Sequence, residues 1–416
     1  MKKISSTLGC FHCPDVEKQG EEGRHKALFD ATIKGNWTSA EKILKEYPEC
    51  ATHSITIRNE TVVHIAAAGK NKEFLEKLVK ILEKKGDKSF SILAQRNTLG
   101  CSAFYFAVLS GVVDNAKVMV EKNKDLPTIR SKDKSDDIGK LPINHAALSG
   151  RKKMVAYLFQ KTPFEMLLEA DRIGLLQATI RYDMYDTALQ IIDKDPLLAT
   201  KEYDTQRNRT FLHLLARKDL TERSWRRFLV STCAVFSARL WDTIQERTLA
   251  MKLLKKIWGE YLKLAEETLA GKIKKTEILH YAAKEGNVEF LSMILNSKPD
   301  LLWEFNSKEQ NIFHIAVLHR QKDVFHFIYR FGPFKDLISV QRDNQQNNIL
   351  HSAAKLRTSR SSKESTGDDN PQQPKITSYI HKVETDIPKS LLKVSGAALR
   401  LQRELLWFMV SKQLQN

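Results

Sequence analysis

Histidine, the side chain that titrates closest to neutral pH, recurs along this 416-residue chain in one short phrase. His64, His213, His280, His314 and His351 each follow two apolar residues and precede an alanine by one to three positions. General acid–base catalysis would require an acid or a nucleophile to recur beside each histidine, and none does. The pattern therefore favours a structural role, in which each histidine orders a helix start and hydrogen-bonds a neighbouring loop.

A second candidate for chemistry lies near the N-terminus, where Cys10, His12 and Cys13 are close together. Two thiols separated by two residues are typical of zinc sites, but a structural zinc needs four ligands and no second pair follows. We weigh three interpretations of this segment: free thiols in a disordered N-terminus, S-acylation, and metal binding, in that order of preference. The remaining cysteines lie near apolar residues and are expected to be core side chains: Cys50, Cys101 and Cys233.

Motifs that bind phosphate or perform hydrolysis are missing from the sequence. Neither a Walker-type loop nor the Gly-x-Gly-x-x-Gly pattern occurs, and kinase, hydrolase and zinc-protease signatures are absent. We therefore expect a protein that is not an enzyme and that needs no cofactor and no metal.

The elements that position the histidines form an internal repeat. The position equivalent to the histidine recurs at residues 29, 64, 105, 144, 176, 213, 280, 314 and 351. Seven of the eight intervals lie between 32 and 41 residues, and one is 67. A period in the mid-thirties with this wording is the sequence signature of ankyrin repeats.

Each unit has the same internal plan. A glycine often follows the alanine pair, as at Gly111 and Gly286, and a second segment then places apolar residues at i, i+1, i+4 and i+5. Pro48, Pro196 and Pro299 close three of the units. This plan predicts an all-α ankyrin-repeat solenoid of helix-turn-helix units, in which stacking supplies the core that no single helix pair could provide.

The repeat also predicts which residues hold the stack together and which face a partner. The expected structural positions are His64, Asn144, His213, His280, His314 and His351. The candidate protein-binding surface consists of the two variable residues before the glycine position: Leu109, Ser110, Leu148, Ser149, Lys284, Glu285, Leu318 and His319.

The interval of 67 residues contains an amphipathic helical pattern with a basic opposite face, which is either an insertion or a degenerate repeat, and we favour an insertion. A polar stretch after His351 resembles a disordered loop. The predicted domains are 1–24 (disordered N-terminus), 25–218 (about six repeat units), 219–275 (basic helical insertion), 276–358 (about three units), 359–394 (flexible loop) and 395–416 (truncated helical tail).

The net charge of +17, from 67 basic and 50 acidic residues, favours acidic partners. Most of it is expected to belong to solvated faces, with contact to an anionic membrane surface as the second interpretation. Nucleic acid is not expected, because no groove-reading module accompanies the charge. No apolar stretch spans a bilayer and no secretory signal is visible, so we expect a cytoplasmic chain, peripheral at most at the cytosolic face of the plasma membrane.

Several phrases resemble one family, the plant ankyrin-repeat membrane proteins with a C-terminal PGG domain. The resemblance covers about residues 25 to 408 and is carried by the following segments: 40–50, 214–218, 286–291, 312–317, 395–399 and 402–407. It implies a role in defence and stress signalling at the plasma membrane. In the family a block of spanning helices follows, whereas this chain ends at Asn416, which predicts a truncated or alternatively spliced form.

The function predicted from the sequence is a non-enzymatic scaffold for protein–protein interaction. The alternatives are a membrane-peripheral regulator that binds anionic lipid or full-length relatives through basic faces, and a fragment without independent function. The identity of the protein partner does not follow from the sequence.

Overall fold

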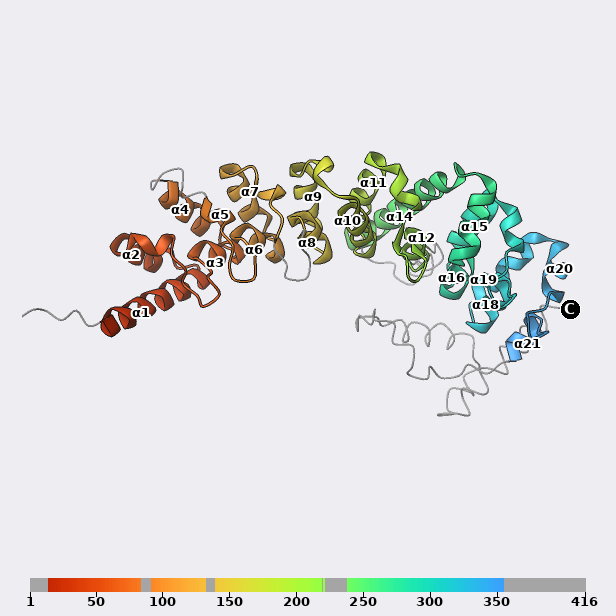
Figure 1. The fold of residues 1–416 in the computed structure, drawn as a ribbon. Coiled ribbons are helices and arrows are strands. Elements are labelled where there is room, and N and C mark those ends of the chain that lie inside the picture. The colour runs from red at the N-terminus through yellow and green to blue at the C-terminus, as the bar shows by residue number, and fades with distance from the viewer. Residues whose placement is uncertain (1–13, 84–90, 132–138, 219, 221–237, 355–416) are drawn as a thin grey trace, which may run out of the picture. The chain divides into compact units, whose positions relative to one another are not determined.

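The computed structural model describes residues 14–83, 91–131, 139–218, 220 and 238–354. Within these ranges nearly all regular structure is helical (Figure 1). The strands found there are β1 (Glu202–Asp204) and β2 (Arg209–Thr210), which pair antiparallel. The prediction of an all-α fold is confirmed.

The chain separates into two compact units, Met1–Leu198 and Ala199–Asn416. Each unit is a stack of helix pairs and is described here by itself. The borders that the sequence predicts for a helical insertion at 219–275 stay a prediction.

Every repeat position expected from the sequence lies in a helix, which we call the first helix of its repeat. In the first unit these helices are α1 (Pro14–Ile33), α3 (Val62–Ala68), α6 (Ala103–Ser110), α8 (Pro142–Leu148) and α10 (Glu169–Arg181). In the second unit they are α12 (Phe211–Ala216), α16 (Ile278–Glu285), α18 (Ile312–Leu318) and α21 (Ile349–Ala354). Within each unit every first helix packs against the next, which is the stacking expected of ankyrin repeats.

A second helix follows most first helices. In the first unit the second helices are α2 (Trp37–Glu46), α4 (Lys72–Glu83), α7 (Val113–Lys122), α9 (Lys152–Lys161) and α11 (Tyr185–Lys194). In the second unit they are α14 (Ala238–Leu262), α17 (Val288–Ser297) and α19 (Lys322–His326), which continues into the 3₁₀ helix η7 (Phe327–Phe331). The predicted i, i+1, i+4, i+5 face is buried: in α4, Phe74, Leu75, Leu78 and Val79 are at most 2% exposed.

Short elements complete the repeats. Pro48, Pro196 and Pro299 begin 3₁₀ turns after second helices, because proline cannot continue a helix but fits its first turn. The short elements are η1 (Pro48–Ala51), α5 (Ser91–Ala94), η3 (Leu126–Thr128), η4 (Phe164–Met166), η5 (Pro196–Thr200), α15 (Glu266–Thr276), η6 (Pro299–Trp303) and α20 (Phe334–Val340).

The glycine turns take the conformation that the sequence requires. Gly111 and Gly286 end α6 and α16 with φ of 77° and 81°, in the left-handed region where a side chain is strained. A Cβ atom at Gly286 would lie 2.4 Å from Oε1 of Gln321. Glycine therefore allows the next repeat to approach closely at this turn.

Two segments differ from the sequence-based expectation or refine it. Helix α1 begins at Pro14, although residues 1–24 are predicted to be disordered. The proline and the charged helix-forming residues after it are compatible with a helix start, which the repeat-based argument did not consider.

Helix α14 explains much of the 67-residue interval. It packs against α12 and α17, and it buries the expected apolar side chains, including Leu253, Ile257 and Trp258. Trp258 donates an Nε1–H hydrogen bond of 2.7 Å to Oγ of Ser297 in α17. Since α12 also packs against α16, the first helices on either side of the interval are neighbours.

A polar side chain at the start of a second helix ties each repeat to the preceding one. Nδ2 of Asn287 donates to the carbonyl oxygens of Leu215, Ala216 and Lys218 at 3.4, 3.0 and 2.9 Å. In the first unit Nδ2 of Asn115 lies within 3.3 Å of the carbonyl oxygens of Ala66, Ala67 and Gly69. These carbonyls lie at or just beyond the end of the first helix of the previous repeat, where the regular i→i+4 backbone donors run out. The neighbouring repeat thus completes the helix end.

Asn287→Ala should destabilise the second unit, because it removes the side-chain donor that the carbonyl groups at the end of α12 share, among them the buried Ala216 carbonyl. We expect a loss of about 1–3 kcal/mol in the free energy of unfolding, measured by urea denaturation and circular dichroism. Asn296→Ala, at an exposed position of the same helix, is the matched control and should change stability by less than about 0.5 kcal/mol. Equal effects of the two substitutions would contradict this assignment.

Candidate interaction surface

The predicted structural histidines lie at the starts of first helices, and two of them bridge repeats through both ring nitrogens. Nδ1 of His213 accepts a hydrogen bond from the backbone N–H of Thr210, so its Nε2–H donates to the Thr276 carbonyl at 3.1 Å. In His314, Nδ1 lies 2.8 Å from Oδ1 of Asn311, and Nε2 lies 3.3 Å from the carbonyl of Asn347. One ring nitrogen therefore orders the helix start, and the other contacts a backbone carbonyl just before the first helix of the next repeat.

The remaining structural positions vary this arrangement. Nε2 of His280 lies 2.8 Å from the Gln310 carbonyl. Asn144 replaces the ring with an amide that donates from Nδ2 to the carbonyl of Asp171 at 2.8 Å. His64 is fully buried, with Nδ1 accepting from the backbone N–H of Thr61 at 3.2 Å. His351 is exposed, and its Nδ1 lies 2.6 Å from Oδ1 of Asn348.

Burial shifts the protonation of these rings. Desolvation, together with the nearby guanidinium of Arg209, lowers the pKa of His213 to about 4. Burial also lowers the pKa of His64 and of His280. These rings are neutral in the folded protein at neutral pH, and in His213 this agrees with hydrogen bonding through one acceptor and one donor nitrogen.

The eight residues predicted to face a partner lie at the C-terminal ends of α6, α8, α16 and α18. Leu109 and Leu148 are 36% and 49% exposed, which is high for leucine in a folded chain. Among the polar members, Ser149, Lys284, Glu285 and His319 are exposed. Ser110 and Leu318 are half-buried, and Oγ of Ser110 donates to the Ala107 carbonyl at 3.0 Å. The structure thus places these positions at the surface, while their role in binding stays a prediction.

The loops that precede first helices, which we call finger loops, carry polar residues that sequence reasoning missed. Oδ1 of Asn97 accepts hydrogen bonds from the backbone N–H groups of Leu99 and Cys101. Thr56, Asn306 and Asp343 repeat this pattern, each accepting from the second and fourth residues that follow. All four lie eight residues before the repeat position of their unit, and that constant offset is a signal that could have revealed them.

Hydrogen bonds within and between finger loops also hold Asp343. Burial raises the pKa of this carboxyl, but hydrogen bonds from Asn347 and Gln345 oppose that effect, and the net pKa is lowered. The backbone N–H of Asn344 donates to the Lys308 carbonyl at 3.1 Å, joining two successive loops. In the first unit the N–H of Thr98 donates to the Arg58 carbonyl at 2.9 Å in the same way.

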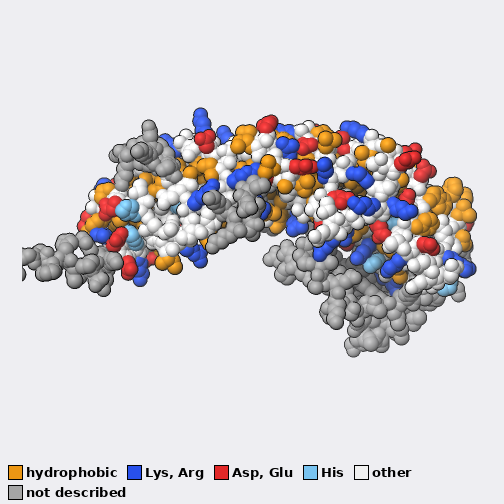
Figure 2. Space-filling model, viewed as in Figure 1, with side chains coloured by type: hydrophobic (Ala, Val, Ile, Leu, Met, Phe, Trp, Pro, Cys, Tyr) orange, Lys and Arg blue, Asp and Glu red, His pale blue; other side chains and the backbone are white. Residues whose placement is uncertain are grey.

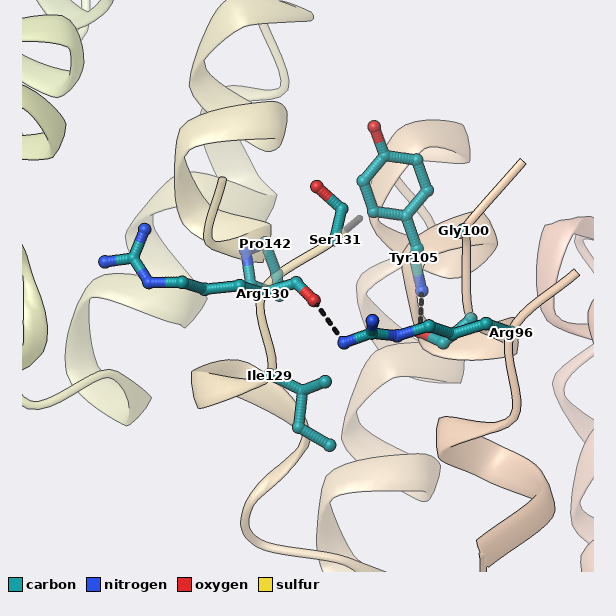
Figure 3. Close-up of a pocket in the computed structure, with 8 residues that line it drawn as sticks. Arg96, Gly100, Tyr105, Ile129, Arg130, Ser131 and Pro142 are labelled. Atoms are coloured by element: carbon teal, nitrogen blue, oxygen red, sulfur yellow. Dashed lines mark hydrogen bonds between the residues drawn. The ribbon is translucent and has the colours of Figure 1, made fainter. Parts of the chain in front are cut away.

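A shallow pocket lies between two finger loops of the first unit (Figure 3). Nη2 of Arg96 donates to the Arg130 carbonyl at 2.8 Å across this pocket. Arg130 in turn reaches the next loop, where Nη2 pairs with Oδ2 of Asp171 at 2.5 Å and donates to the Met166 carbonyl at 3.3 Å. The full lining consists of Arg96, Gly100, Ser102, Tyr105, Ile129, Arg130, Ser131 and Pro142.

Beside this pocket a histidine joins a tyrosine and a serine from different repeats. Nδ1 of His145 lies 2.8 Å from the Tyr105 hydroxyl, and Nε2 lies 2.9 Å from Oγ of Ser131. Oγ of Ser131 also lies within hydrogen-bond distance of the backbone N and O of Lys140. Since these contacts close the loop, we interpret the serine as a structural residue and not as a nucleophile.

An exposed apolar face on α20 is a further feature that the repeat pattern does not predict. Phe334, Leu337 and Val340 are 55%, 56% and 66% exposed, and apolar side chains gather over this helix in Figure 2. The ring of Trp303 lies 6.3 Å from that of Phe334, edge to face. A short helix between two repeats has no fixed place in the period, so its exposed face is not visible from the sequence.

The other candidates for chemistry have different outcomes. Cys10, His12, Cys13 and Cys233 lie outside the described residues. Burial raises the pKa of the Cys50 thiol, and Cys101 is half-buried. In the described part of the chain, no group of three or more His, Cys, Asp or Glu side chains is arranged to hold a metal ion. No helix there combines the length and apolar character needed to cross a membrane.

Comparisons with known proteins return similarity to solved structures, one of which is an ankyrin repeat domain. One is a human ASB11 ankyrin repeat domain, with 12% identity and a TM-score of 0.33 over 70% of this chain and 90% of that one. Another is a chain in the structure of yeast ribosomal protein Rps3 with its chaperone Yar1, with 21% identity and a TM-score of 0.31 over 34% of this chain and 94% of that one. No protein-family model matches the chain. No curated protein sequence matches it either.

Acidification should destabilise the second unit through His213. In the unfolded state the His213 ring has a pKa near 6.5, whereas in the folded state its pKa is about 4. The contribution of His213 to the free energy of unfolding is therefore fully present above pH 6.5 and is lost as the pH falls toward 4. His213 alone should contribute a loss of about 2 kcal/mol between pH 8 and pH 5.

His213→Asn copies the natural arrangement at Asn144 and removes the titrating group. We expect the variant to be less stable at pH 8 but to lose about 2 kcal/mol less than the parent chain between pH 8 and pH 5, measured by urea denaturation. His53→Asn, at an exposed position, serves as the control. A variant that keeps the full pH dependence of the parent would show that His213 is not responsible.

Proposed function

We propose that the chain is a non-enzymatic scaffold for protein–protein interaction. The observation that carries this proposal is that each repeat buries its polar groups in structural hydrogen bonds and exposes other side chains to solvent. Polar groups that could do chemistry, such as His213 and Asn287, are buried and committed to hydrogen bonds between repeats. Variable positions such as Leu109 and Leu148 are left at the surface.

The finer role follows from the sequence resemblance alone. The plant ankyrin-repeat membrane proteins act in defence and stress signalling, and we propose a related role near the cytosolic face of the plasma membrane. The similarity to solved structures adds nothing to this biological setting.

Substitution of the two exposed leucines tests the scaffold function. Leu109→Glu combined with Leu148→Glu should release protein partners that the parent chain captures in cross-linking pull-downs, because burying a carboxylate in an interface is unfavourable. Val340→Glu, which is also at an exposed apolar position, is the matched control for general loss of capture. Partner recovery that is the same for all three chains would contradict the assigned surface.

A second candidate function is binding to anionic membranes. It is favoured by Lys252, Lys255 and Lys274, which are exposed on α14 and α15 and form no ion pair within the described ranges. Figure 2 shows Lys and Arg side chains dispersed over the visible face. That dispersal favours the scaffold as the principal function.

Vesicle sedimentation decides between the two functions. Membrane binding predicts that the chain sediments with phosphatidylserine-containing vesicles in about 150 mM salt. It also predicts that Lys252→Gln, Lys255→Gln and Lys274→Gln together abolish sedimentation. A parent chain that stays in the supernatant would contradict the membrane function and leave the scaffold function intact.

A further inference from the structure

We propose that the finger loops of the first unit bind an extended, acidic peptide segment of a protein partner that also carries apolar residues. The site comprises the exposed tips of two loops, 52–61 and 95–102, and the pocket beside the second loop. This inference rests on the proposed scaffold function and names the chemistry of the partner.

Unpaired positive charge is the first observation. Arg58 and Arg96 are exposed on successive finger loops, and neither forms an ion pair within the described residues. The carboxylate on these loops, Glu60, is only 8% exposed and is held by Oγ1 of Thr56 at 3.1 Å and Nδ2 of Asn97 at 3.4 Å. A carboxylate from outside can therefore pair with each arginine without displacing an internal partner.

Apolar side chains beside these arginines are the second observation. Ile57 is fully exposed and Leu99 is 57% exposed, and each lies at the tip of its loop. The hydrogen bond from Thr98 N–H to the Arg58 carbonyl holds the two tips together. Exposed apolar residues in a fixed pair are suited to cover the apolar side chains of a bound peptide.

The pocket has a volume of only about 10 Å³, so an acidic side chain would lie over its mouth, against Arg96, and not inside it. Nη2 of Arg96 donates to the Arg130 carbonyl, so the remaining N–H groups of this guanidinium can donate to a carboxylate. Ile129 and Pro142 provide apolar walls, and in Figure 3 the Arg96 side chain extends below Tyr105 to the Arg130 carbonyl. Arg130 does not compete for the ligand, because Asp171 neutralises it.

Loop spacing defines the length of peptide that each finger reads. Packed helices lie about 8–10 Å apart, and an extended chain rises about 3.3 Å per residue. Neighbouring fingers therefore correspond to about three residues of an extended peptide. The expected ligand places acidic residues about three positions apart with apolar residues between them.

A peptide is favoured over nucleic acid for two reasons. Base stacking requires free aromatic faces, and the aromatic residue at this site, Tyr105, is engaged by His145 at its hydroxyl and its ring. The apolar side chains of Ile57 and Leu99, at the loop tips, also form no favourable polar interaction with a phosphate backbone.

The test is a selection of random peptides of roughly twelve residues, long enough to span about four fingers, on the immobilised full chain. We expect enrichment of peptides with acidic and apolar residues at the predicted spacing. Fluorescence anisotropy of an enriched peptide should show about tenfold weaker binding when its Glu and Asp residues are replaced by Gln and Asn.

Variants of the protein locate the site. Arg58→Gln combined with Arg96→Gln should weaken peptide binding about tenfold, and Ile57→Ser combined with Leu99→Ser should do the same. Arg207→Gln, at an exposed finger-loop arginine of the second unit, is the matched control and should leave binding unchanged. Arg58→Gln alone removes no side-chain hydrogen bond or ion pair within the described residues, so a reduced affinity there reports on the charge and not on the fold.

Several outcomes would overturn the proposal. These are enriched peptides without acidic residues, equal binding to the double arginine variant, or no enrichment at all. Binding of single-stranded DNA that is lost in the arginine variant would show that the surface takes a different occupant. The scaffold function fails separately, when cross-linking recovers the same proteins with the Leu109→Glu, Leu148→Glu chain as with the parent.

Discussion

The fold depends on hydrogen bonds that cross from one repeat to the next. A first helix of six to eight residues has at least as many backbone groups without an intrahelical partner at its ends as paired ones in its middle. Asn115 and Asn287 satisfy the carbonyl ends, and His213, His280 and His314 tie the loops that lead into the next helix. Each repeat is therefore complete only when its neighbour is in place.

This constraint explains the composition of the interior. Buried amide groups usually destabilise a core, but here the Nδ2 groups of Asn115, Asn144 and Asn287 donate to backbone carbonyls of a neighbouring repeat. Hydrophobic burial in the second helices, for example at Leu75 and Leu78, provides the attraction between layers. The polar links determine the register at which the layers meet.

Much of the fold was predictable because the same short sequence pattern recurs in every repeat. Nine positions with the same neighbours had to occupy equivalent places, and the alternation of apolar pairs identified the second helices. Helix α14 was harder to place, since its pairing with α12 depends on packing between segments far apart in the chain. The start of α1 was missed because local helix propensity, and not the repeat, sets it.

The surface was less predictable than the core. Position in the repeat indicated that Leu109 and Leu148 would be exposed, and the structure agrees. The pocket near Arg96 combines residues from loops more than thirty positions apart, and the exposure of Ile57 depends on how its loop turns. Neither follows from periodicity, although the constant offset of Thr56 and Asn97 from the repeat position was open to discovery.

The substitution of histidine by asparagine at residue 144 has a consequence for how the chain comes apart. An amide does not titrate in this pH range. The hydrogen bond from Asn144 in α8 to the Asp171 carbonyl in α10 therefore persists at acid pH values where buried imidazoles become protonated. Repeat arrays unfold junction by junction, because each layer contacts only its neighbours. Lowering the pH should therefore break some junctions between repeats before others. The side chain at the histidine-equivalent position of each repeat determines that order.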